Sequence, residues 1–364
     1  MKFKVNREKF QKALQRVVSI IGARSILPML GNVLVEAGDG TLKLTTTDLD
    51  IRITTSVEAE VSDPGTGTVP ARRLAQLVGT FTAPELEVET DAENHCRIVC
   101  GTGKFLLLGL PAEEFPAQSD FETVRSFKLK ESDFKHMIGS IAYAVSIDDS
   151  RKVLTGVLMS IHDSLLTMVA TDGKRMAMRE TAPEDFNGAD GNAIVPIKAV
   201  QEVKRMLEGG DAATIEFGEK QCRIRTAAAE LTTKLIEGSY PNFRQVIPTK
   251  WTRTVEAPVP LFLSKIEMVS LMLSESSSYI ILNFGDNKMK IQGASSEIGE
   301  GSDEIDIEYS ADPFEVSFNP SYLADPMRNT ASETVRMKFN DPLTPVTIET
   351  EEGFLYVIMP IRKK

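Results

Sequence analysis

The sequence is poor in the residues that metal sites, disulfide frameworks and nucleophilic active sites use. It contains only three cysteines, three histidines and one tryptophan among 364 residues. Three cysteines cannot form the disulfide network that stabilises small secreted proteins. Long apolar runs are absent too, since no stretch approaches the roughly 18 apolar residues of a membrane-spanning helix. The opening MKFKVNREKF has no apolar signal region, so we expect a cytoplasmic protein.

The few cysteines and histidines do not suggest a metal site. His95, Cys96 and Cys100 form the one cluster of metal-ligand residue types in the sequence. On a strand, neighbouring side chains point to opposite faces, which argues against zinc coordination. Cys96 and Cys222 occupy matching positions in the repeat described below, and free cysteines are commonly buried. We therefore predict buried structural thiols, with no metal and no other cofactor.

No catalytic arrangement is recognisable. The segment GTGK at 101–104 resembles part of a phosphate-binding loop, but Ile98 stands where that motif needs its first glycine. Asp48 and Asp172 recur at one repeat position ahead of turns, where aspartate commonly bonds to local backbone. We therefore predict a protein that is not an enzyme. An enzyme that uses these aspartates with a metal is the alternative.

The most informative feature of the sequence is an internal repeat of about 125 residues. The segments at 31–53 and 156–178 share one order: a glycine, an apolar strand-like run, a turn, a second run and Thr-Asp. Other landmarks return after 124 to 126 residues, namely Val69-Pro70, Val195-Pro196 and Asn319-Pro320, and Cys96-Arg97-Ile98 and Cys222-Arg223-Ile224. Three copies of one domain's length therefore fill the chain.

Each repeat is predicted to hold two helices packed on short antiparallel strands, an α+β pattern. Apolar spacing predicts helices at 6–24, 69–79, 128–141, 196–207, 264–275 and 319–329. Asn6, Ser132 and Ser264 are expected to cap three of them, the last in a capping box with Glu267. Pro326 should bend or shorten the final helix. The predicted domains are 1–118, 119–249 and 250–364.

Charge is segregated between the predicted helices and the rest of the chain. The net charge of −11 argues, taken alone, against nucleic-acid binding. The six predicted helices, however, sum to +8, whereas the remainder sums to −19. One interpretation is that the helices use lysine and arginine as ordinary solvated residues. The other is a basic helical surface on an acidic protein.

Six stretches, in order, carry a family resemblance. They are MKFKVNREKF (1–10), LPMLGNVLVEA (27–37), LTTTDLDI (44–51), TDGKRMAM (171–178), GSYPNFRQVIP (238–248) and YVIMPIR (356–362). With them the chain resembles the bacterial DNA polymerase III β subunit, the replicative sliding clamps, over essentially its whole length. The resemblance implies three clamp domains per subunit and a head-to-tail homodimer. That dimer would close a ring around double-stranded DNA and act as a non-catalytic processivity factor.

The resemblance also implies protein partners. The replicative polymerase, the clamp loader and other proteins would dock short linear motifs in a pocket of the middle and last domains. The residues at the matching positions are Leu154, Thr171, Gly173, Lys174, Arg175, Met176, Pro241, Val246, Tyr322, Leu343, Val357, Met359, Pro360 and Arg362. Without the resemblance, the apolar members would be interpreted as ordinary core.

DNA contacts and a ring interface are implied as well. The DNA contacts are Arg24 after the first helix and Arg151 and Lys152 in the loop at 148–152, to which the basic helices add Arg72, Arg73 and Lys198. The implied interface residues are Phe105, Leu107, Met272 and Leu273. Departures from the family are Lys174 in place of a common histidine, Gln245 where arginine can occur, and the Lys363-Lys364 ending. A monomeric adaptor or structural repeat protein is the alternative to a ring.

Overall fold

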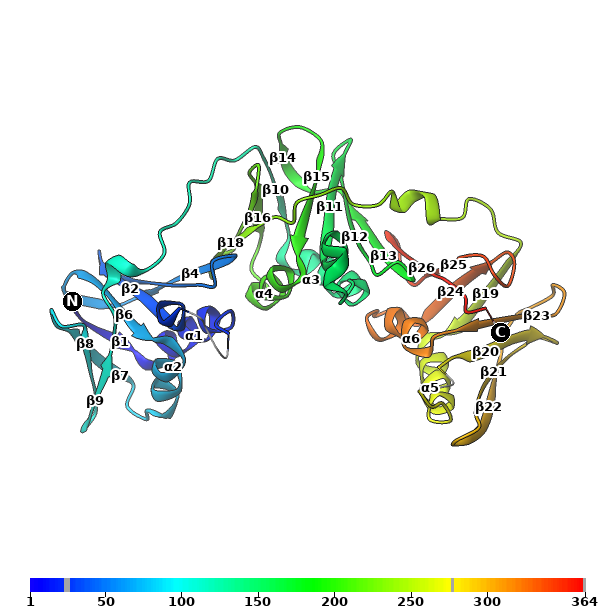
Figure 1. Ribbon diagram of the computed structural model, residues 1–364, viewed down its shortest axis with the longest axis horizontal. Coiled ribbons are helices and arrows are strands. Elements are labelled where there is room, and N and C mark those ends of the chain that lie inside the picture. The colour runs from blue at the N-terminus through cyan, green and yellow to red at the C-terminus, as the bar shows by residue number, and fades with distance from the viewer. Residues whose placement is uncertain (23–26, 276–277, 363–364) are drawn as a thin grey trace. The chain divides into compact units, whose positions relative to one another are not determined.

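A computed structural model describes residues 1–22, 27–275 and 278–362, and Figure 1 labels its helices and strands. By its contacts the chain divides into two compact units. The first unit holds residues 1–135, 183–189 and 198–235, and the second holds residues 136–182, 190–197 and 236–364. Both combine helices with antiparallel sheets, which confirms the α+β prediction. Within the described residues, no helix is long and apolar enough to span a bilayer.

The first unit contains two sheets. Their strand orders are β5-β1-β7-β8-β9 and β14-β10-β16-β17-β18-β4-β3-β2-β6. The longer sheet joins the first and second sequence repeats through the antiparallel pair β18–β4. The strands are β1 (Lys2–Asn6), β2 (Asn32–Gly38), β3 (Thr41–Thr47), β4 (Ile51–Glu58), β5 (Glu60–Asp63), β6 (Gly65–Pro70), β7 (Glu85–Thr90), β8 (His95–Cys100), β9 (Gly103–Leu108), β10 (Arg125–Leu129), β14 (Glu184–Asn187), β16 (Ala213–Phe217), β17 (Gln221–Arg225) and β18 (Glu230–Lys234).

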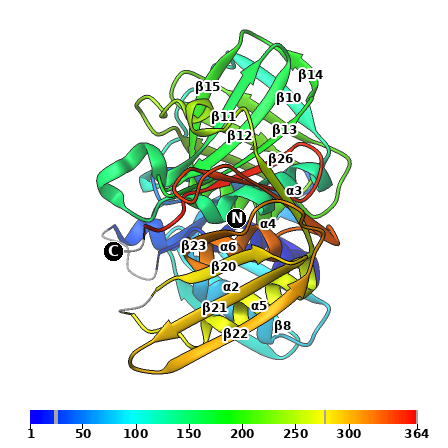
Figure 2. The same cartoon turned by 90° about the vertical axis from the view of Figure 1, so that its right-hand side faces the viewer.

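The second unit repeats this plan. Its sheets have the orders β15-β11-β12-β13-β26-β25-β24-β19 and β22-β21-β20-β23, and β26 pairs with β13 as β18 pairs with β4. Figure 2 shows β20, β21 and β22 in front of α5, which contacts all three. The strands are β11 (Gly156–His162), β12 (Leu165–Thr171), β13 (Arg175–Thr181), β15 (Gly191–Pro196), β19 (Arg253–Pro258), β20 (Ile280–Gly285), β21 (Lys288–Ser295), β22 (Gly299–Asp306), β23 (Phe314–Phe318), β24 (Thr334–Phe339), β25 (Val346–Glu349) and β26 (Phe354–Ile358).

Helices α2 (Ala71–Thr80) and α4 (Ile197–Met206) lie close to their predicted positions. Helix α1 (Arg7–Val18) begins as predicted but ends at Val18, well before the predicted residue 24. The predicted cap of α1 is confirmed, because Asn6 Oδ1 accepts hydrogen bonds from the amides of Glu8 and Lys9, both at 3.1 Å. Residues at helical spacing form its buried face, namely Phe10, Ala13, Leu14 and Val17. This face anchors α1 against α2 and β4.

Helix α3 (Glu131–Ile141) does not begin as predicted. Ser132 is not its cap but lies in its first turn, with a hydroxyl that contacts Asp133. The helix starts one residue earlier, at Glu131, whose buried carboxylate accepts from the amides of Gly209 and Gly210 at 3.0 and 2.9 Å. Burial of this carboxylate, which needs those two donors, holds the start of the helix in place.

Helix α5 (Val259–Ser270) begins before the expected Ser264, so the capping-box prediction is wrong. The apolar spacing already starts at Val259, and Phe262, Ile266 and Val269 continue the buried face. Pro260 lies in the first turn, where a missing amide proton costs no helical hydrogen bond.

Helix α6 (Pro320–Arg328) contains Pro326 and ends two residues after it, which confirms the predicted shortening. Proline cannot donate to the carbonyl four residues earlier, which belongs to Tyr322. The hydroxyl of the buried Tyr356 supplies the missing donor, with its Oη 2.7 Å from Tyr322 O. The Tyr356 side chain on β26 thus replaces the helical hydrogen bond that Pro326 cannot make.

Candidate functional site

The segment that organises the site is the tight turn between β12 and β13. Thr171 Oγ1 donates to Arg175 O at 2.6 Å and accepts from the Gly173 amide at 3.1 Å. Asp172 Oδ1 accepts from the amides of Lys174 and Arg175 at 2.8 and 3.0 Å. Gly173 has φ +85°, which favours glycine. Asp172 therefore has the local backbone role that the sequence predicted.

Arg175 links this turn to α6 and to the 3₁₀ segment Ala142–Ala144 that follows α3. Its side chain is about 10% exposed, and it pairs with Asp172, at 3.2 Å, and with Asp325. It also donates to Tyr143 O at 2.7 Å, and its guanidinium lies 4.3 Å from the centre of the Tyr322 ring. Burial alone would lower the pKa of Arg175, but the surrounding Tyr356 and Asp325 oxygens raise it above its ordinary value. The side chain is thus a fixed cation beneath the turn.

Beside the turn lies a groove of about 160 Å³ in the second unit. Its floor consists of Leu154, Met176 and Val357, which are 3–5% exposed, whereas Val246 and Met359 are 46% and 41% exposed. Met176 and Val357 pair across β13 and β26 and belong to one buried cluster, so the core interpretation of these two also holds. The Met359 amide donates to Lys174 O at 3.0 Å and so continues the strand past its end.

Ten of the fourteen residues implied for the partner pocket line this groove. They are Leu154, Thr171, Gly173, Lys174, Arg175, Met176, Pro241, Val246, Val357 and Met359. The other four lie outside its lining: Tyr322 under Arg175, Leu343 exposed before β25, and Pro360 and Arg362 after β26. Sequence reasoning missed Asn242 and Phe243, which also line it. Their position directly after Pro241 was the available signal.

The first unit and the second unit each have a sheet that ends in an open edge strand. Strand β9 ends one sheet and β22 ends another. Phe105 is 40% exposed on β9, while Leu107 is half-buried, and Met272 and Leu273 are half-buried after α5. Sequence reasoning missed more exposed apolar neighbours, namely Leu106, Leu108, Met268 and Leu271. The alternation of strand side chains places Leu106 and Leu108 on one face and the two predicted residues on the other.

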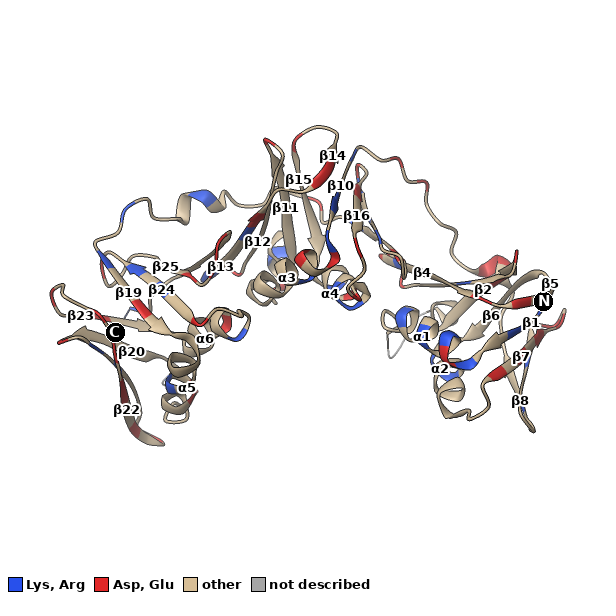
Figure 3. Cartoon of the chain, turned by 180° about the vertical axis from the view of Figure 1, so that it is seen from behind, with Lys and Arg blue, Asp and Glu red and all other residues tan. Residues whose placement is uncertain are grey.

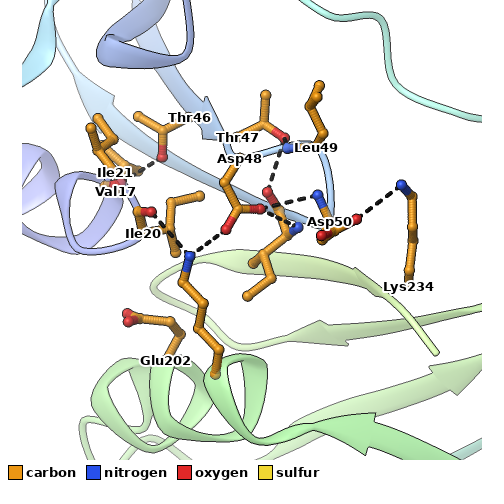
Figure 4. A network of polar contacts seen from close by, with 12 residues as sticks. Val17, Ile20, Ile21, Thr46, Thr47, Asp48, Leu49, Asp50, Glu202 and Lys234 are labelled. Atoms are coloured by element: carbon orange, nitrogen blue, oxygen red, sulfur yellow. Dashed lines mark hydrogen bonds and ion pairs between the residues drawn. The ribbon is translucent and has the colours of Figure 1, made fainter. Parts of the chain in front are cut away.

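Basic residues gather on the helices of the first unit (Figure 3). Helices α1, α2 and α4 together carry nine Lys or Arg and two Asp or Glu. Arg73 is exposed on α2, while Arg72 donates to Ile21 O at 2.5 Å. Lys198 on α4 pairs with Asp48, which belongs to the polar network in Figure 4. The positive charge is concentrated here, because α5 and α6 each carry one basic and one acidic residue.

The remaining cations implied for DNA contact lie elsewhere in the chain. Arg24 lies outside the described residues. In the second unit, Arg151 and Lys152 belong to an irregular 3₁₀ segment, and Arg151 Nε is 3.3 Å from Asp148 Oδ2. Lys152 is exposed, and Ile147 nearby is fully exposed.

The cysteines are buried, as predicted. Burial raises the pKa of the Cys96 thiol to about 11 and raises that of Cys222 further. The described residues contain no group of three or more His, Cys, Asp or Glu side chains that could hold a metal ion. The GTGK segment forms the β8–β9 hairpin turn at residues 101 and 102, with Gly101 at φ +58°, and the first two residues of β9.

Comparison with known proteins accounts for the whole chain. Family models of the DNA polymerase III β subunit match in order: the N-terminal domain at 1–119, the central domain at 128–242 and the C-terminal domain at 244–362. The β sliding clamp of Escherichia coli strain K12 is 33% identical over 367 residues, which cover 100% of both proteins. That of Chlamydia muridarum is 31% identical over 362 residues, 100% of this chain and 99% of the relative.

Solved structures agree with these sequence matches. A sliding clamp from Pseudomonas aeruginosa bound to griselimycin is similar with a TM-score of 0.95 at 28% identity, and the polymerase III β protein of Caulobacter crescentus with 0.92 at 28%. Each comparison covers 100% of both chains. The three repeats are therefore three clamp domains, and the chain belongs to the DNA polymerase III β subunit family.

Proposed function

We propose that this protein is a sliding clamp that holds a DNA polymerase on its template. Two copies join head to tail, and the ring encircles double-stranded DNA without reading its sequence. The protein performs no chemistry of its own; it raises the local concentration of its partner, so that dissociation is followed by rebinding. The domain boundaries 1–118, 119–249 and 250–364 are part of this proposal. Membership of the family supports it.

The groove beside the 171–175 turn carries the proposal for partner binding. An apolar floor below exposed Val246 and Met359 fits a short peptide with apolar anchors. Methionine adapts to several partner shapes, which suits a site shared by the polymerase, the clamp loader and other proteins with such motifs. Arg175 holds the turn rigid beneath the peptide. The entropic cost of binding then comes mostly from ordering the peptide.

Ring closure is supported by the two open edges. Strand β9 presents Leu106 and Leu108, and the region around β22 and the end of α5 presents Leu271. Exposed apolar edge strands are hazards that proteins usually cover. When two different edges cover each other, the contact between subunits is heterologous. Such contacts produce a closed ring only if the rotation from one subunit to the next brings the last subunit back to the first. A monomer in solution would instead favour the adaptor alternative.

DNA encirclement is supported by the charge of the first unit's helices. Their nine basic and two acidic residues contrast with the net charge of −11 for the whole chain. Contacts from such side chains to phosphates attract any sequence equally, which suits a protein that slides. Among the described residues, Arg73 and Lys152 are exposed basic side chains that can make such contacts.

The experiment that tests the groove is fluorescence anisotropy with a labelled peptide of the type Gln-Leu-x-Leu-Phe. We expect saturable binding with a micromolar Kd that weakens at least tenfold for Met359→Ala and disappears on truncation after Ile358. Leu165→Ala is the matched control, because Leu165 is also exposed in the second unit but does not line the groove. Unchanged binding by the truncated protein would remove this groove from the proposal.

A further inference from the structure

The first unit contains a copy of the turn that organises the groove (Figure 4). Between β3 and β4, Thr47 Oγ1 donates to Ile51 O at 2.9 Å and accepts from the Leu49 amide at 3.1 Å. Asp48 Oδ1 accepts from the amides of Asp50 and Ile51 at 3.0 and 2.7 Å. These four bonds repeat those of the 171–175 turn one for one. Leu49 even adopts the positive φ, +79°, that Gly173 adopts at the equivalent position.

The neighbouring strands repeat as well. Arg52 of β4 faces Thr232 of β18, in the register in which Met176 faces Val357. Past the strand end, the Lys234 amide donates to Asp50 O at 3.0 Å, as the Met359 amide donates to Lys174 O. The backbone framework of the groove therefore exists twice. Its lining differs, because the apolar Met176, Val357 and Met359 are replaced by Arg52, Thr232 and Lys234.

This copy encloses a groove of about 330 Å³, which we call the first-unit groove. It is lined by residues from the end of β3, the β3–β4 turn, β4, β17, β18 and the segment 116–119: Thr47, Leu49, Asp50, Ile51, Arg52, Pro116, Ala117, Gln118, Ser119, Gln221, Thr232, Thr233 and Lys234. Thr232 Oγ1 and Gln221 Oε1 are buried atoms without a hydrogen-bond partner among the described residues. Buried polar atoms normally have partners. An extended acidic peptide supplies both kinds: a carboxylate oxygen accepts from the Thr232 hydroxyl, and a backbone amide donates to Gln221 Oε1.

Arg52 is the second indication of a ligand. Its guanidinium donates to Pro116 O and lies 5.6 Å from the centre of the Phe115 ring. No carboxylate of the described residues lies within ion-pair distance of it. Burial lowers the pKa of Arg52 below its ordinary value, and the more distant Glu36 carboxylate offsets this only in part. Lys234 pairs with Asp50 at 3.0 Å, but both side chains are mostly exposed, so that pair can exchange.

We propose that the first-unit groove binds an acidic peptide segment, with Arg52 and Lys234 pairing with its carboxylate and Thr232 donating a hydrogen bond to it. The backbone framework suits an extended chain, because its counterpart in the second unit is the groove proposed above to bind a peptide. The charge of the lining reverses the preference from apolar to acidic side chains. The proposal extends the peptide-docking role proposed above and is tested separately from it.

The test uses the full-length chain with a fluorophore on a single new cysteine, Gln118→Cys. Gln118 is exposed in the groove, and the three native cysteines are buried, so labelling is selective. The probes are acetyl-Glu-Asp-Glu-Ser-amide and the uncharged acetyl-Gln-Asn-Gln-Ser-amide. We expect a saturable signal from the acidic peptide that is at least tenfold weaker with the uncharged one. No signal from the acidic peptide, or equal signals from both, would overturn the proposal.

Inorganic phosphate separates a peptide site from a general anion site. If phosphate gives the same signal at the same concentration as the acidic peptide, the occupant is a simple anion and the peptide proposal fails. Thr232→Val changes only the hydroxyl and should weaken acidic-peptide binding about threefold to tenfold. Arg52→Met, which recreates the residue of the second groove, should abolish it. Unchanged binding by both variants would also refute the proposal.

Met359→Ala is the control that keeps the two proposals apart. It lies in the second unit's groove, so it should leave acidic-peptide binding unchanged while weakening the apolar peptide. Arg52→Met should have the opposite pattern, with apolar-peptide binding intact. If the unmodified protein does not bind the apolar peptide, the proposed function is contradicted. The acidic-peptide result would still decide whether the first-unit groove binds an acidic segment.

Discussion

Glu208 is the carboxylate whose removal should have the clearest measurable effect. It follows α4 and joins it to α1, where Arg16 Nε and Lys12 Nζ lie 2.8 and 2.7 Å from its oxygens. A second bond from Arg16 at 2.9 Å makes the pair bidentate. Hydrogen bonding from Arg16 lowers the pKa of Glu208 from 4.5 to about 2. This carboxylate therefore ties together helices of the first and second repeats.

The pKa shift sets the magnitude of the expected effect. Each unit of pKa corresponds to about 1.4 kcal/mol, so the full shift would amount to roughly 3 kcal/mol. The Glu208 side chain is 33% exposed and Lys12 is 62% exposed, so solvent screening reduces this to about 1–2 kcal/mol. We expect Glu208→Gln to lower the free energy of unfolding by that amount at pH 7.

The pH dependence supplies an independent check. A carboxyl with a lowered folded-state pKa stabilises the protein above its unfolded pKa, here about 4.5. That stabilisation is lost as the pH falls from about 4.5 towards 2. The difference in unfolding free energy between the native protein and Glu208→Gln should therefore be constant from pH 7 to 5 and shrink below pH 4.5.

Urea unfolding followed by circular dichroism measures both effects. Glu58→Gln is the matched control, because Glu58 pairs with Lys9 alone among the described residues, at 2.6 Å, and both are mostly exposed. Its effect on the free energy of unfolding should be much smaller than that of Glu208→Gln, because solvent screens an exposed ion pair. Equal effects of the two substitutions, or a Glu208 effect that does not change between pH 5 and 3, would refute the reasoning.

Glu208→Gln also frees Lys12 and Arg16, so the slope of log K for DNA binding against log salt concentration should steepen by up to about 2.

Three further predictions concern the fold and the interface. Tyr356→Phe should lower the free energy of unfolding by about 1–2 kcal/mol, measured with urea, because Tyr322 O loses its donor. In a Pro326→Ala background the loss should be smaller, because the alanine amide can donate to Tyr322 O. An equal loss in both backgrounds would contradict the role given to the Tyr356 hydroxyl. Gly173→Ala should lower the free energy of unfolding by about 1 kcal/mol and weaken apolar-peptide binding. The backbone of residue 173 has φ +85°, which disfavours alanine, and the new Cβ would lie 2.8 Å from an Arg151 nitrogen. Unchanged binding would show that the turn adapts. Leu106→Asp should yield monomers in sedimentation while Leu165→Asp should not, and a dimeric Leu106 variant would exclude β9 from the ring interface.

The repeats and the local signals of helices could be predicted from the sequence, because they depend on residues close together in the chain. Asn6 caps α1 and Pro326 shortens α6 as expected, since each acts on its own helix. The starts of α3 and α5 were wrong for the opposite reason. Glu131 is held by amides almost 80 residues away, and the buried side chain of Val259 extends α5 beyond a plausible serine cap.

The groove could be assigned from the resemblance but not from the residues alone. Met176 and Val357 are 181 positions apart, and only the register of β13 with β26 makes them one floor. Their burial is that of core residues, so composition could not separate a groove from a core. Val246 and Met359 make the difference, because their exposure turns the edge of a core cluster into a surface that a peptide can cover.

The duplicated turn shows what a repeat conserves and what it leaves free to change. Both copies keep four hydrogen bonds from the threonine and aspartate side chains and one residue with positive φ. In the first copy that residue is Leu49, although glycine adopts this conformation more easily. A strained leucine persists only where the surrounding hydrogen bonds determine the backbone. The side chains at Arg52 and Met176 are bound by no such requirement, since they point from the same register into two different grooves. Difference in ligand preference can therefore arise at these positions without any cost to the framework that holds them.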